Sequence, residues 1–178
     1  LRRIPTPTDR RLLVGAATLL DGSPDNNFLE RAQLADGTTA FNPDGLLDGG
    51  VAGAVAGHYL YVCAARGLVV VDIDEPLRPR VVATIPMREP RAVAVQFRYA
   101  FVAGADGLTV LEVTEPERAR SVATVPLDDA HDVYLARTYA YVAGGAQGLV
   151  IVDVERPEHP VIDQIYTAGG AIDDARAV

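Results

Sequence analysis

The chain has almost no cysteine, because Cys63 is the only one among 178 residues. A single thiol excludes an intrachain disulfide and a thiolate-rich metal site. No Cys-x-x-Cys-His motif occurs either, so this chain cannot attach a c-type haem. Cys63 therefore has to be explained as an ordinary side chain, and it occupies a position equivalent to Ala103 and Ala143 in the repeats described below, which predicts a small buried residue of a strand.

Long apolar runs are also missing. The longest one near the start, from Leu12 to Leu20, contains glycine and threonine. A helix that spans a bilayer needs about 18 or more apolar residues in succession. The sequence therefore predicts no membrane-spanning segment.

Basic residues are outnumbered, with 16 Lys and Arg against 24 Asp and Glu and a formal net charge of −8. Binding to nucleic acid relies on a basic patch that neutralises phosphates, and none is present. The sequence also lacks a Gly-x-Ser-x-Gly motif, a phosphate loop and a dinucleotide fingerprint. We therefore expect no nucleic-acid partner, we designate no catalytic residue, and a non-enzymatic protein is favoured.

What the chain does have is a repeat of about 40 residues. Aromatic pairs recur twice at a spacing of 40, and a Gly-Leu pair follows each of them at steps of 40 and 41. Such self-similarity is the signature of a repeat architecture. The landmarks are Tyr59/Tyr61, Tyr99/Phe101 and Tyr139/Tyr141, followed by Gly67-Leu68, Gly107-Leu108 and Gly148-Leu149.

Each repeat contains four short β-type segments bounded by turn formers, which in the middle unit are residues 91–96, 99–103, 107–113 and 120–126. The third segment is apolar at successive positions, as in GLVVVDI at 67–73 and GLVIVDV at 148–154, so both of its faces must be buried. Antiparallel sheets that are covered on both faces are typical of radially stacked propeller blades. The sequence predicts an all-β fold, a partial β-propeller with about three to four blades of four antiparallel strands.

The third segments carry a more specific signal. Residues 149–153 read LVIVD, residues 68–72 read LVVVD and residues 108–112 read LTVLE. Over roughly residues 50–178 the chain resembles the LVIVD-repeat family of bacterial and archaeal β-propeller proteins. The resemblance implies an extracytoplasmic location, that is, secreted, periplasmic or on the cell surface. Some proteins of this type also accompany multihaem cytochromes.

We predict one incomplete propeller domain, because three units cannot close a ring that needs about four to eight blades. We expect the remaining blades to come from further sequence or from another chain. The predicted boundaries are 1–20 for the end of a preceding blade and the start of a degenerate one, 21–50 for a loop insertion, 51–90, 91–130 and 131–174 for three blades, and 175–178 for the first strand of a further blade.

The loop insertion is either a specificity-bearing loop or a plain linker. Within it, residues 28–34 predict a short helix. The acid pairs at 128–129 and 173–174 each precede a new unit. We interpret them as solvated turn acids.

A polar ring is predicted at the mouth of the central channel. Arg91, His131 and Arg176 occupy equivalent positions at the start of a unit, and Asp132 follows His131. First strands of blades line the channel, which would gather these four side chains. A solvated or hydrogen-bonded role is favoured over a ligand or acid–base contact, because adjacent residues of a strand such as His131 and Asp132 point to opposite faces.

Two groups of carboxylates are candidates for binding a cation. Asp21, Asp25 and Asn27 offer oxygen ligands for Ca²⁺, but they lack the ordered spacing of an EF-hand loop. No other cofactor is expected. Acidic residues also end the three third strands, at Asp72, Glu112 and Asp153, where capping of turn N–H groups is the simpler interpretation.

Three functions remain open. The favoured one is a non-catalytic interaction or scaffold module of an extracytoplasmic or cell-surface protein, which binds a protein partner or the remaining blades of its own propeller. The first alternative is an accessory subunit of a larger extracellular assembly, such as one with multihaem cytochromes. The second is a propeller-type enzyme, or a metal or ligand binder, that acts at the central channel.

Overall fold

The computed structural model describes the backbone of residues 11–14, 18–21, 32–33 and 39–178, and the side chains of residues 41–178. Strands dominate this part of the chain. Its only helical elements are short 3₁₀ turns: η2 (Pro43–Gly45), η3 (Pro116–Arg118) and η4 (Ala168–Gly170). The all-β prediction is confirmed.

Three four-stranded sheets follow one another along residues 52–166, and every strand pairs antiparallel with its neighbour in sequence order. The strands predicted for the middle unit correspond to those of the second sheet. Sheet I has β5 (Ala52–Ala56), β6 (Tyr59–Ala64), β7 (Gly67–Asp72) and β8 (Arg80–Ile85). Sheet II has β9 (Pro90–Gln96), β10 (Tyr99–Gly104), β11 (Gly107–Glu112) and β12 (Arg120–Val125). Sheet III has β13 (Asp132–Ala136), β14 (Tyr139–Ala143), β15 (Leu149–Asp153) and β16 (Val161–Tyr166).

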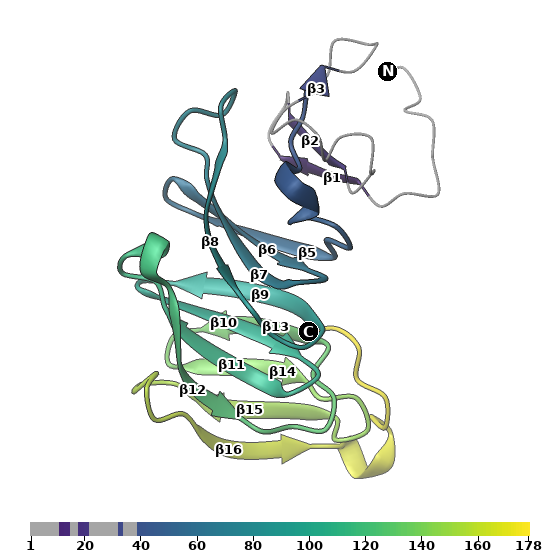
Figure 1. Ribbon diagram of the computed structural model, residues 1–178. Helices are drawn as coiled ribbons and strands as arrows, with labels where there is room; N and C mark the ends of the chain where they lie inside the picture. The colour runs from purple at the N-terminus through teal and green to yellow at the C-terminus, as the bar shows by residue number, and fades with distance from the viewer. Residues whose placement is uncertain (1–10, 15–17, 22–31, 34–38) are drawn as a thin grey trace.

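The three sheets stack face to face, with their first strands β5, β9 and β13 next to one another (Figure 1). Each sheet offers one apolar face to the next sheet along the chain. Burial of this apolar surface stabilises the stack at roughly 25 cal/mol per Å². Together with the strand order, this packing is that of a partial β-propeller, as predicted. The core between sheets I and II includes Tyr61, Leu68, Val70, Ala100, Val102 and Leu111, and the core between sheets II and III includes Phe101, Leu108, Val110, Val142, Val150 and Val152.

The third strands show how far the stacking extends. In β7 the five residues from Gly67 to Val71 are all buried, so both faces of this strand are covered. In β15 buried and half-buried residues alternate instead, and Leu149 and Ile151 are only half-buried. The prediction that both faces of the 148–154 segment are buried is therefore wrong for the described residues, because no further sheet lies against the second face of sheet III.

A short segment covers the other face of sheet I. Phe41 and Leu47 pack against Leu60, Val62 and other residues of that sheet, and both are almost fully buried. The buried Asn42 fixes the segment, because its side-chain oxygen accepts a hydrogen bond from the Leu47 N–H at 2.9 Å. This part of the predicted loop insertion thus belongs to the core.

A fourth sheet precedes the stack, and it does not have the regular antiparallel order. Its strands lie in the order β1-β2-β4-β3, and β2 runs parallel to β4. They are β1 (Arg11–Val14), β2 (Thr18–Asp21), β3 (Ala32–Gln33) and β4 (Thr39–Ala40). The predicted helix over 28–34 is wrong at its described residues 32–33, because their backbone pairs with β4.

The recurring turn glycine is required by close backbone contact. At Gly107 the φ angle is +102°, and a Cβ atom there would lie 2.3 Å from the Val125 carbonyl oxygen. Gly67 and Gly148 occupy the equivalent turns, and a Cβ atom would meet a carbonyl oxygen of the fourth strand at 2.1 Å and 2.6 Å, respectively. Only glycine lets the start of the third segment approach the fourth strand this closely.

We predict that Gly107→Ala lowers the free energy of unfolding by about 3 kcal/mol or more, because the methyl group collides with backbone that cannot move away. Gly57→Ala is the matched control: its φ is also positive, but no atom lies within 4 Å of the added carbon. The control should lose only about 1 to 2 kcal/mol. Urea unfolding followed by circular dichroism measures both losses. Equal losses in the two variants would contradict the role assigned to Gly107.

Candidate site at the inter-sheet rim

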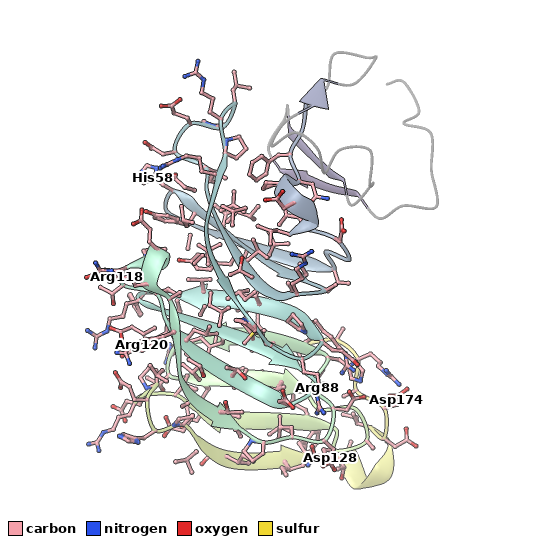
Figure 2. All side chains as sticks on the ribbon, in the orientation of Figure 1. His58, Arg88, Arg118, Arg120, Asp128 and Asp174 are labelled. Atoms are coloured by element: carbon pink, nitrogen blue, oxygen red, sulfur yellow. The ribbon has the colours of Figure 1, made fainter. Side chains whose placement is uncertain are left out.

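The stack has two rims, which differ in the connections that they carry (Figure 2). One rim carries the first hairpin turns, such as the one with His58, and we call it the first-turn rim. The opposite rim carries the connections between successive sheets and includes Arg88, Asp128 and Asp174, and we call it the inter-sheet rim. The predicted residues Arg91, His131, Asp132 and Arg176 belong to the inter-sheet rim.

Arg91 begins the network on this rim. It lies in the first strand of sheet II and hydrogen-bonds to the carboxylate of Asp129, which precedes the first strand of sheet III. The same guanidinium donates to the Ala130 carbonyl oxygen at 3.2 Å and to the Glu89 carboxylate at 3.2 Å. Hydrogen bonding by Asp129 raises the pKa of Arg91, and Arg91 in turn lowers the pKa of Asp129. The pair therefore ties two successive sheets together in its charged form.

His131 continues the network on the other side of Asp129. Its Nε2 lies 2.8 Å from Asp129 Oδ2 and 3.1 Å from Arg176 Nη1, and the side chain is only 12% exposed. A ring nitrogen that carries a proton donates to the carboxylate, whereas a bare one accepts from the guanidinium. His131 Nε2 can therefore hydrogen-bond to only one of these two partners at a time.

The last residues of the chain dock beside His131. Ala175 forms a β-bridge with Gly145, and the Val178 N–H donates to Asp132 Oδ2 at 3.1 Å. The bridge occupies the same place as the hydrogen bond from the Ala130 N–H to the Gly104 carbonyl oxygen, at 3.3 Å, where sheet III begins. Residues 175–178 thus lie where the first strand of a further blade would start.

All four predicted residues therefore contribute to one chain of contacts along the rim, although Asp132 takes part only through the Val178 N–H. Each of the three cations has a carboxylate partner within this network: Glu89 and Asp129 for Arg91, Asp129 for His131, and Asp174 for Arg176. Charges that are satisfied internally are not poised for a reaction. The arrangement acts chemically as a clamp between units.

The sequence interpretation missed Asp129, which was assigned to solvated turn acids and is instead the central anion of the clamp. A signal for it was present in the chain. An acid stands two residues before each ring cation, and the structure pairs all three, with Asp174 and Arg176 2.5 Å apart. Residues at i and i+2 of an extended segment share a face, which explains why the spacing recurs.

The carboxylates at the ends of the third strands hold turns. Asp72 accepts a hydrogen bond from the Asp74 N–H at 3.0 Å, and Asp153 accepts one from the Glu155 N–H at 2.8 Å. These are the turn caps that the sequence favoured. Glu112 instead accepts from the Thr114 hydroxyl at 3.3 Å and pairs with Arg120. The Asp74 N–H and Arg80 both lower the pKa of Asp72, which keeps it ionised.

The candidate calcium ligands cannot be assessed in the same way. Asp21 ends β2, but its side chain lies outside the described part of the chain, as do Asp25 and Asn27 entirely. Among the residues that are described, no group of three or more His, Cys, Asp or Glu could hold a metal ion. Cys63 is fully buried in the core of sheets I and II, and burial raises the pKa of its thiol to about 12, so it is not a nucleophile.

The comparison with protein families matches the LVIVD repeat model to residues 51–84 and 128–168. The chain contains LVIVD repeats. The two matches cover sheet I and sheet III, and they confirm the resemblance that the third strands indicate. Sheet II, whose third strand reads LTVLE, has the same strand order and the same register of its first hairpin as its LVIVD neighbours. Comparison with curated proteins gives no match. Within the described residues, no helix of this LVIVD-repeat chain is long and apolar enough to cross a membrane.

The clamp predicts a specific pH dependence. Because the pKa of Asp129 is lowered in the folded chain, its stabilising effect is complete above the ordinary carboxyl value of about 4 and is lost as the pH falls below it. Asp129→Asn should therefore lower the unfolding midpoint at pH 7, and the difference from the unchanged chain should shrink below about pH 4. Thermal unfolding between pH 2 and pH 8 measures this.

The matched control is Asp128→Asn, since the Asp128 carboxylate forms no ion pair among residues 41–178. This variant should unfold like the unchanged chain at every pH. A difference for Asp129→Asn that stays constant from pH 2 to pH 8 would show that its ion pairs do not stabilise the stack.

Proposed function

We propose that this propeller module is non-catalytic, that it acts by presenting apolar and charged surfaces to protein, and that it belongs to an extracytoplasmic or cell-surface protein. The observation that carries the proposal is the open face of sheet III. The extracytoplasmic location is supported by the LVIVD resemblance.

The open face consists of side chains that lie opposite one another across the strands of sheet III. Tyr134 pairs with Tyr141, and Tyr141 with Ile151, while Leu149 pairs with Tyr166. Tyr134 is 60% exposed and Tyr166 is 48% exposed. Opposed residues of an antiparallel sheet share a face, so these five residues form one apolar surface.

The equivalent surface is covered in the two preceding sheets. Phe101, Leu108 and Val110 of sheet II occupy the positions of Tyr141, Leu149 and Ile151, and sheet III buries them almost completely. Tyr61, Leu68 and Val70 of sheet I are buried by sheet II in the same way. A continuous apolar surface of this kind marks an interaction site. Its occupant is a further sheet of the same repeat type or a partner protein, and the docking of residues 175–178 at Gly145 favours the former.

The two alternative functions fare differently against these observations. An accessory subunit of a larger assembly would use the same open face and differs only in the occupant. A catalytic or ligand-binding channel mouth receives less support, because the cations of the clamp are already paired with carboxylates. Fractionation of cells that produce the full-length protein tests the location. Recovery only in the cytoplasm would contradict it.

We predict that the purified chain associates with itself as its concentration rises and binds a hydrophobic dye, and that Ile151→Glu abolishes both. Ile151 is half-buried, so its replacement should change the unfolding midpoint little. The matched control is Val110→Glu at the equivalent buried position, which should cost several kcal/mol of stability. Sedimentation velocity and dye fluorescence provide the measurements. A monomeric unchanged chain that binds no dye would refute the proposed role of the open face.

A further inference from the structure

A groove lies between sheets II and III on the first-turn rim, opposite the clamp. Its volume is about 440 Å³, and it is lined by the turn between β9 and β10, the turn between β13 and β14, and the loop after β15. The side chains that matter below are Phe97, Arg98, Arg137, Arg156 and Glu158. None of them belongs to the clamp or to the open face of sheet III.

The backbone under this groove is strained. Gly57, Phe97 and Arg137 occupy the same position in the first turns of the three sheets, and their φ angles are +59°, +54° and +56°. This conformation favours glycine, and a bulky residue in it is an outlier. Sheet I follows that rule with Gly57. Phe97 and Arg137 do not, and both of them line the groove.

Packing does not explain these two exceptions. Phe97 is 94% exposed, so its ring gains almost no burial that would offset the strain. Strained residues that the fold tolerates without a packing benefit gather at functional sites. An aromatic ring held out in solvent beside a groove is also a common anchor of protein interfaces.

The charges of the groove indicate what it binds. Arg98 stacks on the ring of Tyr99 at 5.3 Å, and the Tyr99 hydroxyl hydrogen-bonds to Glu158, so this carboxylate already has a partner. Within residues 41–178, the guanidinium groups of Arg137 and Arg156 form neither an ion pair nor a hydrogen bond. Two arginines thus retain the forked donors that bind carboxylates in a bidentate manner.

We propose that this groove binds an acidic peptide segment of a partner protein, with an apolar side chain of the peptide on Phe97 and its carboxylates on Arg137 and Arg156. The inference rests on the proposed interaction function and names the class of one partner. The groove is locally cationic on a chain whose net charge is −8, so charge complementarity favours an acidic segment here and disfavours it elsewhere on the surface.

Fluorescence anisotropy of the full chain with a capped, fluorescein-labelled peptide Glu-Asp-Phe-Glu-Asp tests the proposal. We expect saturable binding that weakens with added salt, no binding of Lys-Lys-Phe-Lys-Lys, and weaker binding of Glu-Asp-Gly-Glu-Asp. Equal binding of the acidic and the basic peptide, or no binding of the acidic one, would overturn the proposal.

Variants locate the binding site. Phe97→Gly and Arg137→Gly should each weaken binding of the acidic peptide about tenfold or more, since each removes an anchor or a charge-assisted contact. Neither variant should lower the unfolding midpoint, because glycine relieves the strained turn. The matched control is Arg118→Ala, an exposed arginine of the same rim that does not line the groove, and it should bind like the unchanged chain (Figure 2).

The outcomes separate this inference from the proposed function. Ile151→Glu should keep its affinity for the peptide, because the open face is distinct from the groove. If the peptide binds equally to Phe97→Gly, Arg137→Gly and the unchanged chain, the groove is not its site and the inference is wrong. Self-association of the unchanged chain would still stand in that case, so the interaction function would survive.

Discussion

Burial of both faces of each sheet is the constraint on which the structure depends. The third strands are apolar at successive positions, so a single sheet cannot cover them, and each sheet needs a neighbour on either side. Sheet II satisfies this need fully, because sheets I and III flank it. Sheet I satisfies it with Phe41 and Leu47. Sheet III satisfies it on one side only, and the interaction function proposed for the chain follows from that imbalance.

Stacking also determines where charges and strain can serve a purpose. On the inter-sheet rim, an acid and a cation two residues apart recur in each unit, and stacking joins them into one clamp that runs from Glu89 to Asp174. On the first-turn rim, the same repetition places Phe97 and Arg137 at strained positions of successive turns. One rim holds its charges paired, and the other leaves two arginines open. The two ends of the stack therefore differ in chemistry although they are built from the same repeat.

Much of the fold could be predicted because its signals are local. A turn glycine, an aromatic pair and an apolar third strand define each four-stranded unit within about 40 residues, and the family comparison supports the same interpretation at sheets I and III. The equivalence of Arg91, His131 and Arg176 was likewise readable from the repeat, and the structure joins these residues in one network. Asp129 was misjudged because a turn acid and a clamp acid look alike until the cation of the preceding unit is placed beside it.

The sequence by itself determined the repeat, the strands and the need for stacked sheets, because a two-residue strand period and a doubly apolar strand leave few other ways to bury the chain. Only the tertiary structure decided which side chains of successive units meet. Arg91 and Asp129 are 38 residues apart in the chain, and Phe97 and Arg137 are 40 residues apart. Contacts over such separations depend on the offset between stacked sheets, and no local pattern encodes that offset.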